Sequence, residues 1–252
     1  IGQDIGEHEF VAQALFADVS AFRIIAMARP GYPGASLSNG AAPEQQADLQ
    51  AVLLDALGVE RAIIAALSAG GPSAIQFAAR HAARCDKLIL VSAASGAMQT
   101  PLPLLARLKQ MALLVHIPGA LSYLRRKVAA NPAAAASRAA NPALAAALEH
   151  PAAGPLLRRF QQSVFTDFRA RLPGTRNDIA QLAALPPLPL HAIRAPVLAV
   201  HGAEDFVVPP AHAQAVADAL PGARLLLLPG GGHEALFTHM DAIRPAVAEF
   251  LR

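Results

Sequence analysis

Short runs of apolar residues recur along the chain, and most are followed by a turn and a segment with helical spacing. The strand-like runs lie at Phe22–Ala28, Ala62–Leu67, Lys87–Ser92, Val197–His201 and Arg224–Leu228. They are apolar throughout, which is typical of parallel strands covered on both faces. Helical patterns lie at Glu7–Ala17, Glu44–Leu57, Gly71–Ala82, Pro210–Leu220 and Met240–Leu251. This alternation predicts a doubly wound α/β fold with a mostly parallel sheet.

The alternation breaks between Met98 and Ile193. This stretch is rich in Ala, Leu, Arg and Pro, and its helix-length segments are bounded by Pro and Asn. Two "NPA" units, at Asn131 and Asn141, are typical of helix starts with Pro at the first position. We therefore predict an α/β core formed by residues 1–97 and 195–252, with a helical cap inserted at 98–194.

Composition indicates one globular unit. Of the 252 residues, 54% are hydrophobic and 15% charged, which is enough apolar material for a large core. The single cysteine, Cys85, excludes an internal disulfide and leaves the compartment open. No Cys/His spacing typical of zinc appears, and we expect no metal and no cofactor. The longest uncharged run, Ala62–Ala79, is interrupted by Ser, Gly, Pro and Gln, so it favours strand, turn and helix over a membrane span.

Charge is unevenly distributed. Residues 101–194 hold 12 basic and 3 acidic residues (+9), the remainder holds 9 basic and 15 acidic (−6), and the sum is the net charge of +3. The basic stretch could attract acidic substrates or an anionic membrane surface. We favour a solvated Arg-rich face docked on an acidic core. Nucleic-acid binding has little support, because only Tyr123, Phe160, Phe165 and Phe168 could stack on bases there.

A candidate nucleophile lies where a predicted strand becomes a helix. The stretch "ALSAGG" matches the G-x-S-x-G pattern, with Ala66 and Gly70 at the small positions around Ser68. Small residues are needed because the turn is sharp and neighbouring backbones crowd the serine. The helix that follows would point its N–H groups and positive dipole end towards the hydroxyl. A serine that only caps the helix is the alternative explanation.

Two later segments supply partners for this serine in the required chain order of serine, acid and histidine. Asp205 follows the strand Val197–His201, and His233 follows Arg224–Leu228 in a glycine-rich loop. Both positions lie at the carboxyl ends of predicted strands, where α/β sheets carry their sites. Among nearby rivals, Glu204 should point elsewhere. We interpret His201 as a structural histidine and His239 as a helix-start residue.

At these residues the chain resembles the α/β-hydrolase family over nearly its whole length. The matching segments are "FRIIAMARPGYPGAS", "LSAGGPSAIQFAARHAARCDKLILVSAAS", "IRAPVLAVHGAEDFVVPP" and "LLLLPGGGHEALF". The resemblance implies Ser68 as nucleophile, Asp205 as acid and His233 as base. Two residues depart from the family pattern: Ala66 replaces a glycine, and Ala28 stands where an aspartate is common.

The resemblance also implies an oxyanion hole made of two backbone N–H groups. One would come from Ala69, the residue after the nucleophile, and we assign the other to Gln3. The opening "IGQDIGEHEF" resembles the end of the family's loop after the third strand, with Gly2 at its glycine. On that basis strands one to three precede Ile1, and we expect an upstream segment that completes the sheet.

The expected activity is hydrolysis of a carboxylic ester or related acyl bond of a small, largely apolar substrate. Apolar cap residues fit a hydrophobic pocket, although helix packing explains most of them: Leu104, Leu108, Met111, Leu114, Phe160 and Phe165. Members of the same fold also serve as ligand receptors, acyltransferases, C–C bond hydrolases or cofactor-free oxygenases and perhydrolases. These activities remain the alternatives.

Overall fold

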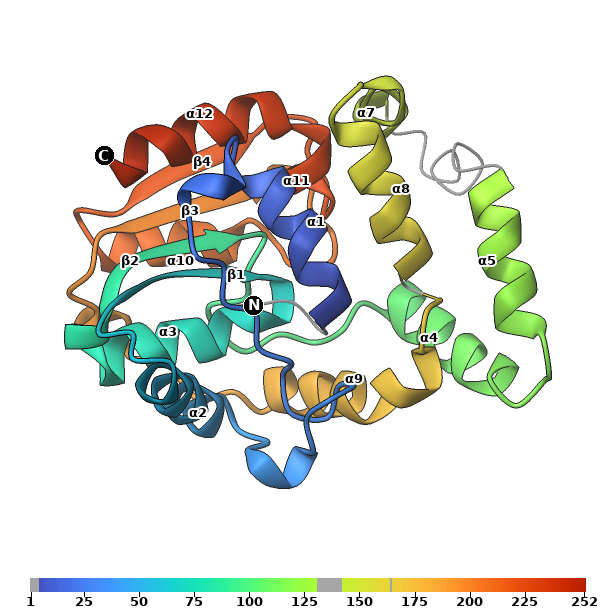
Figure 1. Ribbon diagram of the computed structural model, residues 1–252, viewed down its shortest axis with the longest axis horizontal. Helices are drawn as coiled ribbons and strands as arrows, with labels where there is room; N and C mark the ends of the chain where they lie inside the picture. Colours follow the sequence, from blue (N-terminus) through green and yellow to red (C-terminus); the bar gives the residue numbers. More distant parts are fainter. Residues whose placement is uncertain (1–4, 131–141, 164) are drawn as a thin grey trace.

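A four-stranded parallel sheet forms the centre of the molecule (Figure 1). The computed structural model describes residues 5–130, 142–163 and 165–252. The strands follow one another in chain order across the sheet: β1 (Ala62–Leu67), β2 (Cys85–Val91), β3 (Val197–Gly202) and β4 (Arg224–Leu228). Because parallel neighbours need crossover connections, helices must lie on the faces of the sheet. The predicted doubly wound α/β class is confirmed.

The predicted strand at Phe22–Ala28 is wrong, since this segment is not a strand in the structure. Within the described residues β1 pairs only with β2, so no neighbouring backbone supplies a hydrogen-bond ladder for residues 22–28. Its first side chains remain open to solvent, with Phe22 36% and Ile24 44% exposed. An apolar pattern alone does not reveal whether a pairing strand is present.

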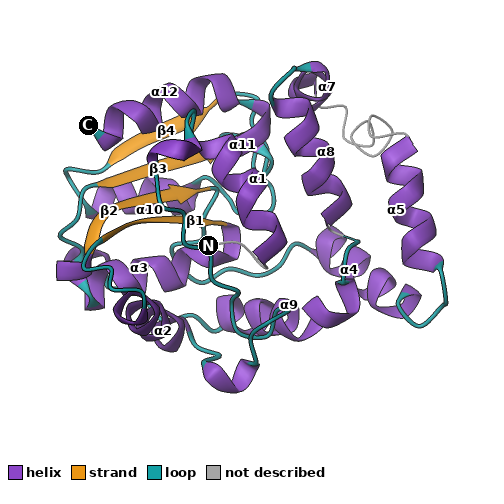
Figure 2. Ribbon diagram, in the orientation of Figure 1, coloured by secondary structure: helices purple, strands orange, loops and turns teal. Residues whose placement is uncertain are grey.

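Both faces of the sheet are covered, and alternate residues of each strand serve opposite faces (Figure 2). In β2, Leu88 and Leu90 belong to one core cluster, and Ile89 and Val91 belong to the other. The first cluster is closed by α2 (Pro43–Ala56), α3 (Gly71–Arg80) and α10 (Ala211–Ala219). The second is closed mainly by α1 (Ile5–Leu15), α8 (Ala153–Ser163), α11 (Ala235–Thr238) and α12 (Met240–Leu251). This two-sided burial explains the uninterrupted apolar runs.

In the described part of the chain between β2 and residue 184, every regular element is a helix and loops connect them. The helices are α4 (Leu102–Leu114), α5 (Ala120–Ala130), α7 (Pro142–Glu149), α8 and α9 (Phe168–Ala183). Pro142 is the first residue of α7, as the second "NPA" unit predicts, whereas the unit at Asn131 lies outside the described residues. No helix in the described ranges is both long enough and apolar enough to cross a bilayer.

Candidate active site

Ser68 occupies the sharp turn between β1 and α3. Its φ is 50°, a left-handed conformation that a non-glycine residue adopts only where the surroundings enforce it. The turn is held from both sides. The Ala94 N–H donates to the Ser68 carbonyl (3.0 Å), and the Ser73 hydroxyl donates to the Gly70 carbonyl (3.1 Å). The strand that enters and the helix that leaves therefore determine where the hydroxyl points.

The small residues around this turn are explained by close backbone approach. Ala66 is fully buried inside the sheet. A Cβ added at Gly71 would collide with the Ala94 carbonyl oxygen and crowd the Ala93 side chain. Gly71 follows Gly70, the second small position of the sequence pattern, so the residue after that pattern must be small as well.

Asp205 lies in the loop after β3, and its carboxylate is fully buried. Oδ1 accepts hydrogen bonds from the N–H groups of Val207 and Val208, both at 2.9 Å. Oδ2 lies 2.8 Å from His233 Nδ1 and 3.5 Å from His201 Nε2. Burial alone would raise the pKa of Asp205, but hydrogen bonds from the two histidines, the charge of His233 and the Val208 N–H outweigh it. The pKa is thus held well below its usual range, and the group is a carboxylate at neutral pH.

His233 lies between the carboxylate and the serine. Its Nδ1 is 2.8 Å from Asp205 Oδ2, and its Nε2 is 3.0 Å from Ser68 Oγ. An ionised carboxylate can only accept, so Nδ1 carries the proton and Nε2 is free to accept the hydroxyl proton. The side chain is 20% exposed, so the imidazole borders on solvent. The arrangement can remove a proton from Ser68 and stabilise the resulting imidazolium.

The histidine loop is held against β3 by glycines. A Cβ at Gly202 would collide with the carbonyl oxygens of Gly231 and Gly232. Two backbone bonds join the loops: Ala203 N–H to the Leu228 carbonyl (3.0 Å) and Glu204 N–H to the Gly231 carbonyl (2.9 Å). This close approach of the two loops brings the His233 side chain next to the Asp205 side chain.

The structure also places the remaining predicted residues. Ala69 is half-buried beside Ser68, whereas Gln3 and Gly2 lie outside the described residues. Glu204 is exposed while Asp205 is buried, which separates the two neighbouring acids. His239 precedes α12 and its Nε2 lies 3.0 Å from the Pro229 carbonyl, in accord with a helix-start residue. Within the described residues no group of three or more His, Cys, Asp or Glu could hold a metal ion.

His201 is more closely tied to the site than its interpretation as a structural histidine indicates. Only 1% of it is exposed, and its Nε2 donates to the Val208 carbonyl at 2.9 Å. The same nitrogen lies 3.5 Å from Asp205, so His201 supports both the carboxylate and the loop around it. Its position on a wholly apolar strand, four residues before the acid, is the signal that sequence reasoning could have used.

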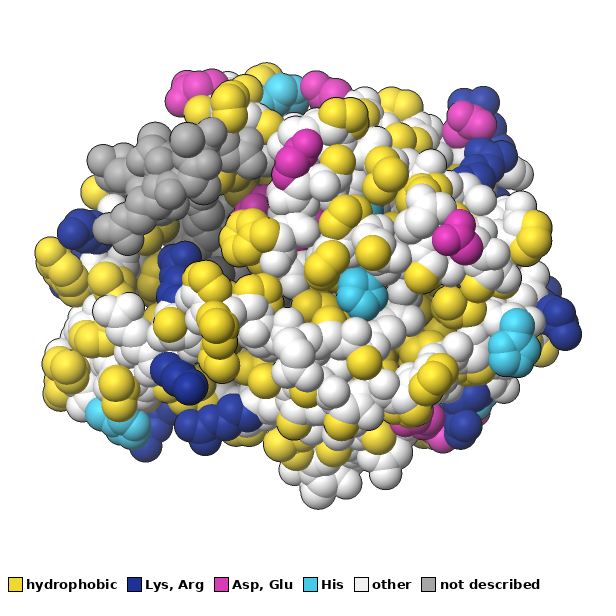
Figure 3. Space-filling view, turned by 180° about the vertical axis from the view of Figure 1, so that it is seen from behind, with side chains coloured by type: hydrophobic (Ala, Val, Ile, Leu, Met, Phe, Trp, Pro, Cys, Tyr) yellow, Lys and Arg dark blue, Asp and Glu magenta, His cyan; other side chains and the backbone are white. Residues whose placement is uncertain are grey.

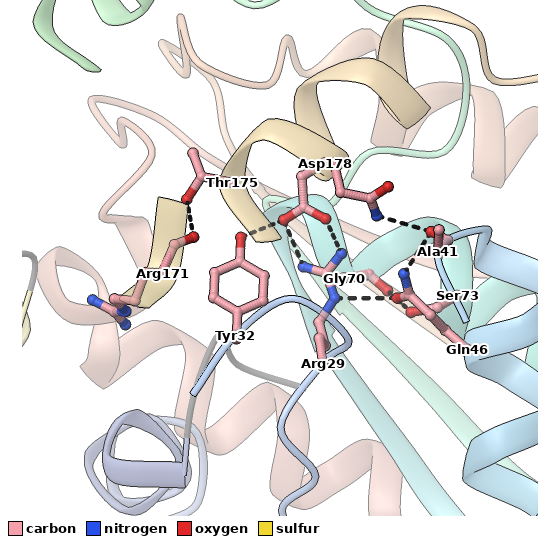
Figure 4. A network of polar contacts seen from close by, with 10 residues as sticks. Arg29, Tyr32, Ala41, Gln46, Gly70, Ser73, Arg171, Thr175 and Asp178 are labelled. Atoms are coloured by element: carbon pink, nitrogen blue, oxygen red, sulfur yellow. Dashed lines mark hydrogen bonds and ion pairs between the residues drawn. The ribbon is translucent and has the colours of Figure 1, made fainter. Parts of the chain in front are cut away.

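A second polar cluster near Ser68 was missed from the sequence (Figure 4). Arg29 binds both carboxylate oxygens of Asp178 on α9, with Nη1 to Oδ2 at 3.1 Å, and Arg29 Nε donates to Gln46 (3.3 Å). The Tyr32 hydroxyl donates to Asp178 at 2.5 Å. Burial and the Asp178 charge raise the pKa of Tyr32 well above its usual range. Arg29 and Asp178 also line a small cavity shared with Ala69 and Ser73.

Comparison with known proteins identifies the family. A family model described as the alpha/beta hydrolase fold matches residues 6–240. The chain belongs to the α/β-hydrolase family. A relative in Caulobacter sp. strain K31, named as a carbamate hydrolase (RutD), is 31% identical over 79% of this chain and 68% of its own length. An uncharacterized hydrolase of Bacillus subtilis (YcgS) is 28% identical over 84% of this chain and 75% of its own length.

Solved structures share the fold. An alpha/beta hydrolase fold protein from Nakamurella multipartita superimposes with a TM-score of 0.75 and 31% identity, over 97% of this chain and 87% of that one. The enol-lactonase of Burkholderia xenovorans LB400 superimposes with a TM-score of 0.65 and 22% identity, over 96% of this chain and 85% of that one. The hydrolase names of the relatives support an enzyme of this family.

Proposed function

We propose that the protein is a serine hydrolase that cleaves a carboxylic ester or a related acyl bond of a small, largely apolar substrate. The observation that carries the proposal is the hydrogen-bonded line from Asp205 to His233 (2.8 Å) and from His233 to Ser68 (3.0 Å). A serine hydroxyl is a poor nucleophile at neutral pH, so a base must take its proton as it attacks. His233 is that base, and Asp205 holds its tautomer.

The reaction proceeds through an acyl-enzyme. Ser68 Oγ bonds to the substrate carbonyl carbon while its proton passes to His233 Nε2. The tetrahedral oxyanion accepts the N–H of Ala69 and a second N–H, which we assign to Gln3. When the intermediate collapses, His233 returns the proton to the departing alcohol or amine. Water, deprotonated by His233, then attacks the acyl group, and Ser68 leaves with the proton.

We also propose that residues 98–194 form a cap over the nucleophile of a core made by residues 1–97 and 195–252. Support comes from Gln181 and Leu182 of α9 and from Leu185, which follows this helix, because they line the same small cavity as Ala69. Helix residues thus reach the turn that carries Ser68. A cap of this kind would shield the site from bulk solvent and select the acyl group.

The proposal is tested with short-chain p-nitrophenyl esters on the wild type and Ser68→Ala. We expect turnover by the wild type and a loss of about 10⁴-fold or more in the variant, because the nucleophile is removed while binding groups remain. A fluorophosphonate should label Ser68 alone, as mapped by mass spectrometry. Ser38→Ala is the control, since that exposed serine bonds only to Ser36 within the described residues and lies outside the turn that carries Ser68.

The related acyl bonds need a separate comparison. The name of the Caulobacter relative suggests a carbamate, so carbamates are assayed beside the esters, and enol-lactones are included as a further acyl bond. An intact fold with no turnover, no fluorophosphonate adduct and tight binding of a small ligand would contradict the proposal and favour a receptor. Release of product to an acceptor other than water would favour an acyltransferase.

A further inference from the structure

The cations of α4 and α5 do not dock on an acidic core. The docking expected from the sequence is seen on α8, where Arg159 pairs with Glu9 of α1 at 3.1 Å. On α4 and α5, by contrast, none of the five cations forms an ion pair with any part of the chain that the structure describes: Arg107, Lys109, Arg125, Arg126 and Lys127. No Asp or Glu occurs between Asp86 and Glu149, so the region is uniformly positive.

Large apolar side chains are exposed beside these cations. Leu102 is 80% exposed and Leu113 72% on α4, while Ile117 is 56% and Tyr123 58% in the turn and α5 that follow. Leu102, Lys109 and Leu113 are spaced by seven and four residues, which puts them on one side of α4. Met111 is the one buried residue of α4, and α5 has none. We call this exposed side of residues 102–127 the α4–α5 face.

Figure 3 shows the same association on the surface. At the end of the molecule that carries α4 and α5, dark blue basic side chains lie among yellow hydrophobic ones, and the magenta acidic side chains lie elsewhere on this view. Exposed leucines bring no benefit in water, and contiguous apolar surface bordered by charge marks an interaction site. The charge defines the partner as anionic.

We propose that the α4–α5 face binds the surface of an anionic lipid membrane. A bilayer interface offers both things that this face lacks, namely negative headgroups for five cations and acyl chains for Leu102, Leu113 and Ile117. A nucleic acid would satisfy the charges but leave these aliphatic side chains in water, and Tyr123 is the one aromatic residue of residues 102–127. Since this surface contains none of the residues proposed for hydrolysis, the inference stands apart from the proposed activity.

The test measures sedimentation of the full chain with vesicles of phosphatidylcholine alone or mixed with phosphatidylglycerol. The Ser68→Ala protein is used, so that lipid cleavage cannot change the vesicles. We expect binding to the anionic vesicles only, weakened by added salt. On this background Arg125→Gln with Arg126→Gln should lower affinity about 25-fold, since each cation near such a surface contributes roughly fivefold. Leu102→Gln with Leu113→Gln should lower it about tenfold or more, with little change in salt dependence.

A matched double variant removes two exposed cations outside the α4–α5 face, Arg23→Gln with Arg194→Gln. It should change affinity by no more than about twofold, because charges beyond a Debye length are screened. Circular dichroism checks that every variant is folded. Absence of binding, equal binding to neutral vesicles, or equal loss in the control variant would overturn the inference. The proposal would also be wrong if the protein bound heparin or DNA as tightly as anionic vesicles and the leucine substitutions did not weaken that binding. The partner would then be a soluble polyanion.

Discussion

Two regions of the helical stretch between β2 and β3 are attached to the molecule in different ways. α9 is anchored by buried charge: Asp178 is 8% exposed and Arg29 4%, and their side chains meet from positions far apart in the chain. Backbone contact reinforces this anchor, since Gly174 N–H donates to the Gly31 carbonyl at 2.8 Å. In α4 and α5 together, by contrast, Met111 is the single buried residue. Closeness along the sequence therefore says little about how firmly a helix is held.

The difference has a physical basis in satisfaction of polar groups. Around Arg29, the guanidinium and the Asp178 carboxylate are each met by at least two partners, so the buried charges are compensated. Such a network fixes one geometry because any displacement leaves a buried charge unpaired. α4 and α5 are bounded by water on most sides, and a displacement there costs little. The predictions below test this contrast between the α9 anchor and the α4–α5 face.

The largest effect is expected from Asp178→Ala. Removing one partner leaves the Arg29 guanidinium buried without its counter-charge, which should lower the free energy of unfolding by about 3–5 kcal/mol. This loss is measured by urea denaturation, with circular dichroism as the signal. Asp218→Ala serves as control, because within the described ranges that exposed carboxylate is bound only by Gln214 of its own helix. It should change stability by no more than about 0.5 kcal/mol. Similar changes in the free energy of unfolding for the two variants would show that the Arg29–Asp178 pair does not anchor α9.

Gly174→Ala tests the close approach of α9 to the loop that holds Tyr32. The new Cβ would lie 2.5 Å from the Tyr32 ring, so the helix or the ring must shift. Overpacking of this kind should destabilise the protein by about 1–3 kcal/mol. Thermal unfolding measures this loss. A Cβ at Gly222 meets nothing within 4 Å, so Gly222→Ala should be nearly neutral in that experiment. A neutral Gly174→Ala would mean that α9 can move away freely.

Tyr32→Phe removes the hydroxyl that donates to Asp178 and should lower the free energy of unfolding by about 1 kcal/mol. The effect depends on pH, because burial and the Asp178 charge raise the pKa of Tyr32 in the folded state. A raised folded pKa gives stability that is fully present below the unfolded pKa of about 10 and is lost as pH rises above it. The advantage of the wild type over Tyr32→Phe should thus shrink in alkaline urea titrations. A constant difference up to high pH would contradict this account.

The smallest effect is expected on the α4–α5 face. Leu113→Gln should change the free energy of unfolding by no more than about 0.5 kcal/mol, because the side chain is 72% exposed and loses little burial. Leu157→Gln on α8 is the matched comparison, since that leucine is fully buried and should be costly to replace. A large loss for Leu113→Gln in urea denaturation would show that α4 is packed far more tightly than its exposure indicates.

Local patterns in the sequence were sufficient for the four strands of the sheet and for the residues brought together at the turn. β1 and β4 have the predicted bounds, because uniform apolar runs ended by polar or glycine residues leave few alternatives. Ser68, Asp205 and His233 were found through their positions after strands, which depend on chain order and not on distance. Their catalytic roles remain a proposal.

What the sequence could not supply depends on long-range pairing. Phe22–Ala28 has the pattern of a strand but no ladder partner in the described part of the molecule. Arg29 and Asp178 meet across 149 positions, and no local signal links an arginine of one loop to an aspartate of a helix so far along. Likewise, the absence of acidic partners for the cations of α4 and α5 is visible only once the helices are placed.

The contact between Gly202 and the histidine loop has a consequence for anyone who engineers this protein. An L side chain at position 202 would collide with the carbonyl oxygens of Gly231 and Gly232, so the loop and its imidazole should shift away from the carboxylate. Saturation libraries at this position should therefore return variants with little of the proposed hydrolase activity. Useful diversity has to be sought in the outer helices, where substitutions leave the reacting atoms undisturbed.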